Sequence, residues 1–258
     1  AKGSPGRRRM RNTLVVAEIA LSVLLLIASG LMVRTFLRLQ DQRLALRTEG
    51  VLTAQVTLPG ATYPEDVQRN AFVQDYRRSL LALPGVRAAG GVLNMHLGRS
   101  RWTMSVLPEG MEYDPKRPLP VAAFNVFTPG YRDVVGIPLL RGRDFTDADV
   151  AGGERVALVS QATAQNLWPG QDPLGKRLNF GPDDKRGWAT VVGLIGDVRQ
   201  NISAEGRVFG EIVVPSTQWN TQTLNWAVRS DSPPSVLAPA MRKLLRSKDA
   251  NLALARHA

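Results

Sequence analysis

The chain has 258 residues, enough for a membrane helix together with one large or two small globular domains. It has no cysteine, which excludes disulfides, cysteine-ligated zinc and thiol catalysis. Its net charge is +11, but nine Lys and Arg against three acidic residues fall within residues 1–49, beside one apolar segment. This placement favours a membrane topology signal over nucleic-acid binding, so no nucleic-acid partner is expected.

The apolar segment is residues 14–33, LVVAEIALSVLLLIASGLMV, with Glu18 as its single charge. As a helix it is roughly 30 Å long, which matches the hydrocarbon core of a bilayer. A signal peptide would have a shorter apolar centre, and twenty apolar residues are long for a buried core helix. The sequence therefore predicts a basic segment at residues 1–12, a transmembrane helix at 13–37 and a connector at 38–50.

Basic residues also predict the orientation of this helix. Residues 1–12 carry five Lys and Arg and no acid, whereas residues 34–49 carry four Lys and Arg. Because basic residues collect on the cytoplasmic side of membrane helices, the N-terminus is expected in the cytoplasm and residues 50–258 outside. The densest part of this topology signal comprises Arg7, Arg8, Arg9 and Arg11.

Glu18 is the candidate helix-packing residue. It lies about one turn into the helix, roughly 6 Å from its edge. A carboxylate there can extend to the interface or accept a hydrogen bond from a neighbouring helix, whereas a proton relay would be deeper and paired. We expect that further membrane helices pack against this one.

Two strand–helix–strand units frame the rest of the chain. In the first, strands at 51–58 and 86–93 flank a helix whose apolar positions Phe72, Tyr76, Leu80 and Leu83 share one face. The second has a strand at 223–229, a helix opening after Pro233 and Pro234, and a final strand at 251–255. This pattern predicts an α+β fold with a split ferredoxin-like lobe, formed by 51–93 and about 223–258.

The middle of the chain is richer in strands. Strands are predicted at 121–127, 155–160, 188–198 and 209–214, and a short helix at 161–168. We expect residues of about 102–187 to form a second, inserted lobe, while the strands within 188–222 are assigned to neither lobe. The outer part is thus predicted as a two-lobed domain.

One segment nearly matches a phosphate-binding loop. Residues 170–177, GQDPLGKR, have the glycine and lysine spacing, but Arg177 replaces the hydroxyl that would hold Mg²⁺. Pro173 removes a backbone N–H, and a short helix instead of a strand precedes the segment. A structural turn is expected here, so this chain should not hydrolyse ATP by itself.

Other catalytic and binding patterns are also incomplete. The glycines of residues 193–196 lack a following helix, and Asp144, Asp147 and Asp149 miss the spacing of a calcium loop. Residues 146–149 are instead predicted to start a short helix with a side-chain cap. The two histidines, His96 and His257, are far apart in sequence. We expect a non-catalytic protein without catalytic, cofactor-binding or metal-binding residues.

Several stretches in a fixed order resemble a known family. They are RNTLVVAEIALS (11–22), FTPGY (127–131), GIPLLRGRDF (136–145), LWPGQDPLGKRL (167–178) and VVGLIGDV (191–198). In this order, and covering most of the chain, they resemble the first half of a MacB-type (FtsX-like) ABC transporter permease, with its first membrane helix and its MacB-like periplasmic core domain at 51–258.

The resemblance implies a location and a role. Such permeases lie in the bacterial plasma (inner) membrane with four helices, and the large outer domain, a porter-like lobe with an inserted lobe, lies between the first two. A separate ABC ATPase subunit drives motion of the outer domain, which exports or extracts a substrate. No cofactor is implied for the permease itself.

The sequence departs from the full pattern at its end, since no second membrane helix follows. One branch of the family fuses two permease units, and the opening residues resemble the junction before a second unit, so the chain is interpreted as a fragment. A second permease unit or fused half is therefore an expected partner. The alternative function is that of a single-pass, membrane-anchored ligand-binding or sensor domain.

Overall fold

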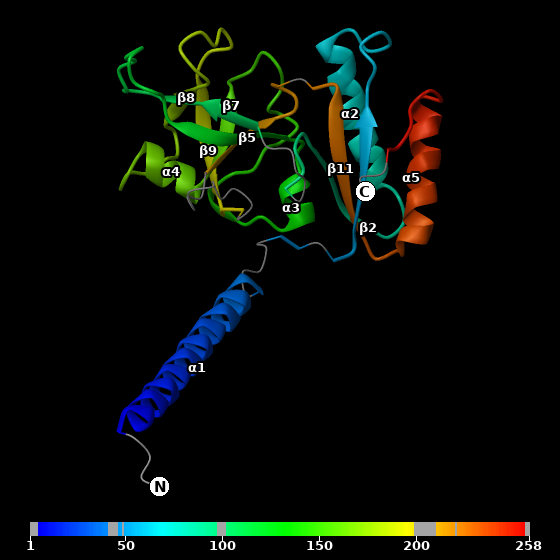
Figure 1. The fold of residues 1–258 in the computed structure, drawn as a ribbon. Helices are drawn as coiled ribbons and strands as arrows, with labels where there is room; N and C mark the ends of the chain where they lie inside the picture. The colour runs from blue at the N-terminus through cyan, green and yellow to red at the C-terminus, as the bar shows by residue number, and fades with distance from the viewer. Residues whose placement is uncertain are drawn as a thin grey trace. The chain divides into compact units, whose positions relative to one another are not determined.

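The computed structural model describes residues 5–40, 46–47, 49–96, 102–198, 210–219 and 221–255, with the backbone alone for 5–12 and 35–40. The chain divides into two compact units, Ala1–Arg43 and Leu44–Ala258. The first consists of one long helix, and the second combines helices with a large mixed sheet (Figure 1). This confirms the predicted α+β class with an N-terminal apolar helix.

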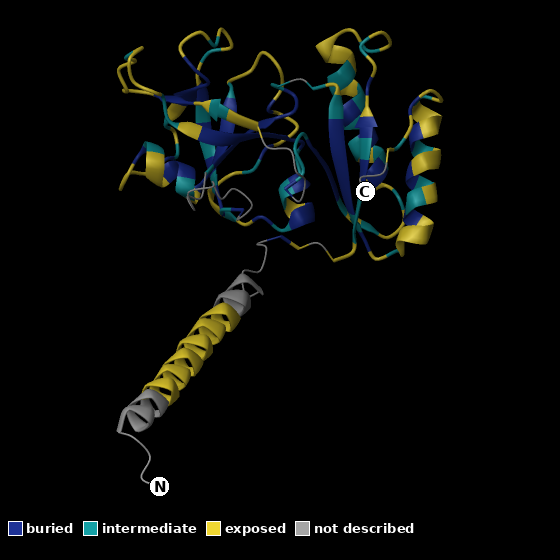
Figure 2. Ribbon diagram, in the orientation of Figure 1, coloured by how far each residue is buried: buried dark blue, intermediate teal, exposed yellow. Residues whose placement is uncertain are grey.

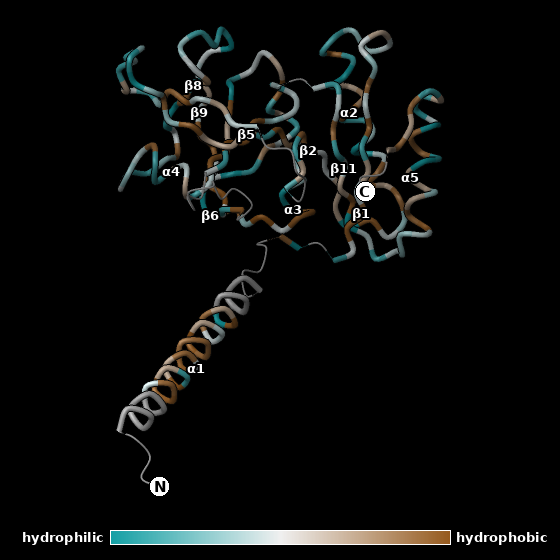
Figure 3. Tube along the Cα trace, viewed as in Figure 1, coloured by the Kyte–Doolittle hydropathy of each residue, from teal (hydrophilic) through white to brown (hydrophobic). Residues whose placement is uncertain are grey.

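The helix of the first unit is α1, Pro5–Gln40. Its stretch Thr13–Arg34 is long and apolar enough to cross a membrane. Its side chains are exposed around the whole circumference, and most are apolar (Figures 2 and 3). A helix that is apolar on every side is stable where lipid or other membrane helices cover it. The predicted span at 13–37 lies within α1, while residues 41–45 and 48 of the predicted connector lie outside the described residues.

The second unit contains eleven strands and four helices within the part of the chain that the structure describes. Its helices are α2 (Asp66–Leu81), α3 (Tyr131–Val135), α4 (Gln161–Leu167) and α5 (Pro234–Lys248). Its strands are β1 (Val51–Thr57), β2 (Val86–Val92), β3 (Trp102–Ser105), β4 (Leu107–Pro108), β5 (Val121–Phe127), β6 (Leu139–Gly142), β7 (Val156–Ser160), β8 (Arg177–Asn179), β9 (Ala189–Ile195), β10 (Glu211–Pro215) and β11 (Thr223–Ser230).

One half of the sheet has the order β1-β11-β2, with α2 and α5 packed against it (Figure 1). β11 is antiparallel to both neighbours, so β1 and β2 are the parallel strands of a split βαβ unit. The core here places Tyr76 of α2 edge-on to Trp226 of β11, with 4.9 Å between ring centroids. Both side chains are fully buried, together with Met241 of α5.

The final strand predicted at 251–255 forms only one bridge in the described residues, between Ala255 and Gln55 of β1. The backbone N–H of Leu252 and that of Asn251 both bond to Asp249, which keeps residues 249–252 in a turn. The chain therefore reaches β1 only at Ala255.

The other half has the order β5-β10-β7-β9-β8-β4, with β3 paired to β5 and β6 paired to β9. The core of this half includes the side chains of Phe124, Leu178 and Ile212. α4 begins at Gln161, directly after its capping residue Ser160, whose hydroxyl accepts the N–H of Thr163, and ends at Leu167, one residue before the predicted end.

The two halves share one sheet through a narrow joint. β2 and β5 are paired through Val92 and Phe127 alone. Central strands are buried on both sides of this joint (Figure 2). Two backbone hydrogen bonds cross the joint beside this pair, from Leu93 to Val126 and from Thr128 to Gly91, and side-chain contacts add to them.

Candidate functional site

The segment that leads into the sheet, described at residues 46–47 and 49–50, is held by Arg229 near the end of β11. Its Nη2 donates to the carbonyl oxygen of Arg47 at 2.7 Å, and its Nη1 to that of Glu49 at 3.2 Å. Its Nε and Nη2 both donate to the carbonyl of Val134 in α3, Nε at 3.0 Å. A guanidinium has five donors in a rigid fork, so this one side chain joins β11, α3 and the entering segment.

Backbone contacts reinforce this docking. The N–H of Arg47 donates to the carbonyl of Val135 at 2.6 Å, and the N–H of Ser230 donates to that of Gly50 at 3.0 Å. Leu46 is buried in the cluster that contains the α3 side chains. A Cβ at Gly136 would lie 2.9 Å from Arg47, so the side chain of Arg47 packs directly over this glycine. We name residues 46, 47, 49 and 50 the docked connector.

α3 is the five-residue helix to which the docked connector is fixed. Gly130 and Gly136 lie at its two ends, with φ of +83° and +76°. This left-handed conformation is unfavourable for residues other than glycine. It packs so closely on β2 that a Cβ at Gly90 would lie 2.4 Å from the Cα of Tyr131. Tight packing of this kind transmits a displacement instead of absorbing it.

The three aspartates that follow α3 each accept hydrogen bonds from an arginine. Asp144 accepts from Arg132 of α3 at 3.0 Å, and Asp147 accepts from Arg77 of α2 at 2.7 and 2.9 Å. We name residues 144–149 the aspartate loop. Its ion pairs join α3 to α2. Within the described part of the chain, no group of residues is suited to bind a metal ion.

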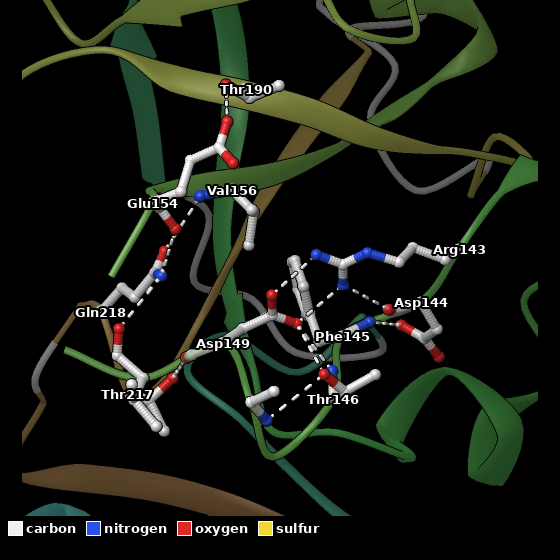
Figure 4. A network of polar contacts seen from close by, with 12 residues as sticks. Arg143, Asp144, Phe145, Thr146, Asp149, Glu154, Val156, Thr190, Thr217 and Gln218 are labelled. Atoms are coloured by element: carbon white, nitrogen blue, oxygen red, sulfur yellow. Dashed lines mark hydrogen bonds and ion pairs between the residues drawn. The ribbon is translucent and has the colours of Figure 1, made fainter. Parts of the chain in front are cut away.

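The third aspartate, Asp149, pairs with Arg143 at 2.8 and 2.9 Å (Figure 4). Burial by itself would raise the pKa of Asp149, but the hydrogen bonds from Arg143 and Thr146 outweigh it, so the pKa lies below its usual value. The carboxylate is therefore ionised at neutral pH and neutralised by the guanidinium.

The short helix predicted at residues 146–149 is wrong, because the structure has a turn there. In a helix cap, the side chain of the first residue accepts an N–H from further along the chain. Both contacts of such a cap are present here: the Thr146 hydroxyl accepts the N–H of Ala148 at 3.3 Å, and Asp149 accepts the N–H of Thr146 at 2.8 Å, but the residues that follow do not form a helix. The side-chain hydrogen bonds therefore close a turn instead of starting a helix.

The same loop is fastened to the segment between β10 and β11 (Figure 4). Thr217 donates its hydroxyl to the carbonyl of Asp149. Gln218 accepts the N–H of Val156 at 3.0 Å and donates to the carbonyl of Glu154 at 2.8 Å. Since β10 belongs to one half of the sheet and β11 to the other, these contacts hold the crossing between the halves.

A buried polar cluster lies at the joint itself. His96 contacts the carboxylate of Glu211 through Nε2 at 3.0 Å and the Tyr131 hydroxyl through Nδ1 at 3.1 Å. Asn125 donates to the same carboxylate at 3.0 Å. Burial would raise the pKa of Glu211, but the charge and hydrogen bond of His96 outweigh it and lower that pKa. No local sequence pattern indicates this cluster, because its members are distant along the chain.

The remaining sequence motifs occupy turns. Residues 170–177 follow α4 and lead into β8, and the N–H of Lys176 bonds to the carbonyl of Pro173. After β9 the N–H of Gly196 bonds to Pro138, and residues 196–198 are not helical. His257 lies outside the described residues.

The membrane-related residues predicted from sequence all belong to α1. Glu18 is exposed there, and its backbone carbonyl accepts the hydroxyl of Ser22 at 2.8 Å. Its role in helix packing stays a prediction. The topology signal also stays a prediction. The structure does not describe the side chains that form it, which are those of Arg7, Arg8, Arg9 and Arg11.

Comparison with known proteins identifies a family and solved structures that are similar to this chain. Residues 13–245 match the family of the MacB-like periplasmic core domain. The extracellular domain of the noncanonic ABC-type transporter YknZ from Gram-positive bacteria is 20% identical, with a TM-score of 0.50 over 80% of this chain and 100% of that chain. The periplasmic region of MacB from Actinobacillus actinomycetemcomitans is 14% identical, with a TM-score of 0.52 over 82% and 90% of the two chains. A comparison with proteins of curated function gives no match. Because the family match extends from within the apolar helix α1 almost to the end of α5, the chain belongs to the MacB-like periplasmic core domain family.

Proposed function

We propose that this chain is a non-catalytic permease component of an ABC transporter in the bacterial plasma membrane. Its N-terminus lies in the cytoplasm and residues of about 50–258 lie outside. A separate ATPase subunit hydrolyses ATP, and the outer domain transmits the resulting motion to export or extract a substrate. The family match and the ABC-type transporter with a similar fold support this role.

The domain limits form part of the same proposal. Residues 51–93 and about 223–258 make a porter-like lobe, and residues of about 102–187 make the inserted lobe. The sheet order β1-β11-β2 and the single pair between β2 and β5 support a division there. The strands within 188–222 complete the inserted half, since β9 and β10 pair with β7.

The observation that carries the proposal is the docked connector. Arg229 fixes this segment at once to β11 and to α3, and α3 is fixed to the aspartate loop by Arg132. The loop in turn is bonded to α2 through Arg77. A displacement of the docked connector therefore meets an unbroken series of ion pairs and hydrogen bonds that reaches both halves of the sheet. Rigid packing between such contacts is what a mechanical element requires.

Replacing Arg229 with methionine tests this role. Methionine keeps much of the side-chain volume but removes all four hydrogen bonds, so we expect the docked connector to separate from α3. Transport by the assembled transporter should fall about tenfold or more, while ATP hydrolysis by the partner subunit continues. The measurement is substrate transport per ATP hydrolysed, with the variant assembled in the complete complex.

Arg87→Met is the matched control, because Arg87 forms an exposed ion pair with Asp231 near the same end of β11. Exposed pairs contribute little, so transport should be unchanged. If Arg229→Met transports as efficiently as the parent protein, the docked connector does not transmit motion.

Glu18→Leu tests the partners within the membrane. The substitution makes α1 more apolar, so insertion should be retained, but a hydrogen bond to a neighbouring helix would be lost. We expect a clear decrease in the fraction of chain that copurifies with a second permease unit in mild detergent. Ser22→Ala serves as the control, since Ser22 bonds to the carbonyl of Glu18 within α1 itself. Equal copurification of Glu18→Leu and parent chain would show that Glu18 has no partner helix.

A single-pass ligand-binding or sensor domain is the second candidate, and one observation favours it. A cleft of about 700 Å³ opens between the halves of the outer unit. This volume is typical of small-molecule sites. Copurification of an ABC ATPase with the full chain distinguishes the two functions, because a sensor needs no such partner.

A further inference from the structure

The cleft between the halves is lined by three arginines from different parts of the fold. Arg69 belongs to α2, Arg155 precedes β7, and Arg186 lies in the segment between β8 and β9. The floor includes Trp219, and the guanidinium of Arg186 lies 3.4 Å from the centre of its ring. The cleft is thus made by both halves of the sheet and by the segment that connects them.

Positive charge in this cleft is only partly compensated. Arg69 pairs with Asp66, but Arg155 and Arg186 share the single carboxylate of Asp184, at 3.8 and 2.7 Å. Among the described residues, then, three guanidiniums face two carboxylates. Arg155 is mostly buried, and burial lowers its pKa; the charge of Asp184 opposes this shift, and the charge of Arg186 adds to it. An additional negative charge would therefore be stabilised in this cleft.

Donor groups remain available for such a charge. A guanidinium carries five N–H donors, and the bonds that Arg186 makes in the described residues use its Nε. Arg186 lines the cleft, and its guanidinium lies against the ring of Trp219, which also lines it. Arginine arranged in this way binds phosphate and carboxylate through paired hydrogen bonds.

We propose that this cleft is a binding site for a small anion that carries phosphate or carboxylate groups. The ligand joins Arg69 of one half to Arg155 and Arg186 of the other, so binding draws the two halves together. This site lies apart from the docked connector, with β11 extending between them: Gln222 lines the cleft, and Arg229 is near the opposite end of the strand. Any effect of binding on transport rests on the proposed function, whereas binding itself does not.

Titration calorimetry of the full chain in detergent tests the proposal, with pyrophosphate, citrate and neutral glucose as probes. We expect heat of binding with pyrophosphate, citrate or both, and none with glucose. Raising the salt concentration should weaken the binding, because the attraction is electrostatic. Pyrophosphate and citrate together show which of the two anionic groups the site prefers.

Arg186→Met should raise the dissociation constant of the bound probe about tenfold. The matched control is Arg177→Met, since Arg177 also pairs with a carboxylate, Glu109, and lies over a tryptophan, Trp188, but outside the cleft. That variant should bind like the parent chain. Both arginines are about half exposed, so neither substitution should prevent folding.

Absence of binding by both anions, equal affinity of Arg186→Met and parent chain, or binding of glucose would each overturn the proposal. The chain is measured alone, so these results do not depend on any ATPase partner. Failure of the transporter role would leave an observed anion site intact, and failure of the anion site would leave the transporter role untouched.

Discussion

Replacing Glu211 with alanine is expected to destabilise the outer unit by about 3–5 kcal/mol, the usual cost of removing one partner of a buried ion pair. The carboxylate accepts from His96 and Asn125, all three side chains are buried, and the cavity left behind has no replacement acceptor. The loss should be concentrated at the joint, because Glu211 begins β10 and His96 follows β2.

Denaturant unfolding followed by tryptophan fluorescence measures this effect. All five tryptophans lie in the outer unit, so the signal reports that unit alone even when α1 is held in a micelle. Glu211→Gln is the matched variant, since it keeps the shape and one acceptor oxygen, and its cost should be smaller. If Glu211→Ala lowers the free energy of unfolding by less than about 1 kcal/mol, this cluster does not contribute substantially to the stability of the outer unit.

The same carboxylate predicts a dependence on pH. The pKa of Glu211 is lower in the folded protein than its ordinary value, near 4.3, so the unfolded chain binds more protons between the two pKa values. The stabilisation is therefore complete above the ordinary pKa and is lost as the pH falls through the folded one. The difference in unfolding free energy between the parent chain and Glu211→Gln should therefore shrink as the pH falls below about 4.

The second large effect is expected for Gly90→Ala, at about 3 kcal/mol or more. A Cβ there would lie 2.4 Å from the Cα and 2.5 Å from the backbone nitrogen of Tyr131, and backbone cannot rotate away as a side chain can. α3 would have to move off β2, which would separate Val134 from Arg229 and Val135 from Arg47 of the docked connector.

Gly91→Ala is the control in the same strand. Its nearest neighbour would be a methyl group of Thr128 at 3.2 Å, a contact that small side-chain shifts relieve. Comparing the two variants by unfolding free energy separates the packing of α3 from the general cost of altering β2. If both substitutions cost the same, α3 is not closely fixed to this strand.

Local sequence patterns predicted most of the elements correctly. The helical stripe of Phe72, Tyr76 and Leu80 lies in α2, and the predicted strand at residues 121–127 has the bounds of β5. These successes share one reason: the period of apolar residues is set by the local geometry of a helix or strand. The helix predicted at residues 146–149 is absent although its capping hydrogen bonds are present, because the chain does not continue as a helix after them.

The sequence could not predict which polar residues pair with one another. Asp147 and Arg77 are separated by 70 residues and His96 and Glu211 by 115. No local pattern indicates which arginine meets which aspartate, because all of these residues are also common on solvated surfaces. The aspartates could be excluded as a calcium loop by their spacing, but their role as ion-pair partners emerged only from the fold.

By itself, the sequence determined the apolar helix with its carboxylate at Glu18, the α+β pattern of the outer unit and the failure of the phosphate-loop motif. Each depends on residues that are close along the chain. The tertiary structure alone decided that β11 inserts between β1 and β2, that Arg229 holds the docked connector against α3, and that three arginines converge on one cleft. These features depend on long-range pairing, which brings distant residues together only when the whole sheet has formed.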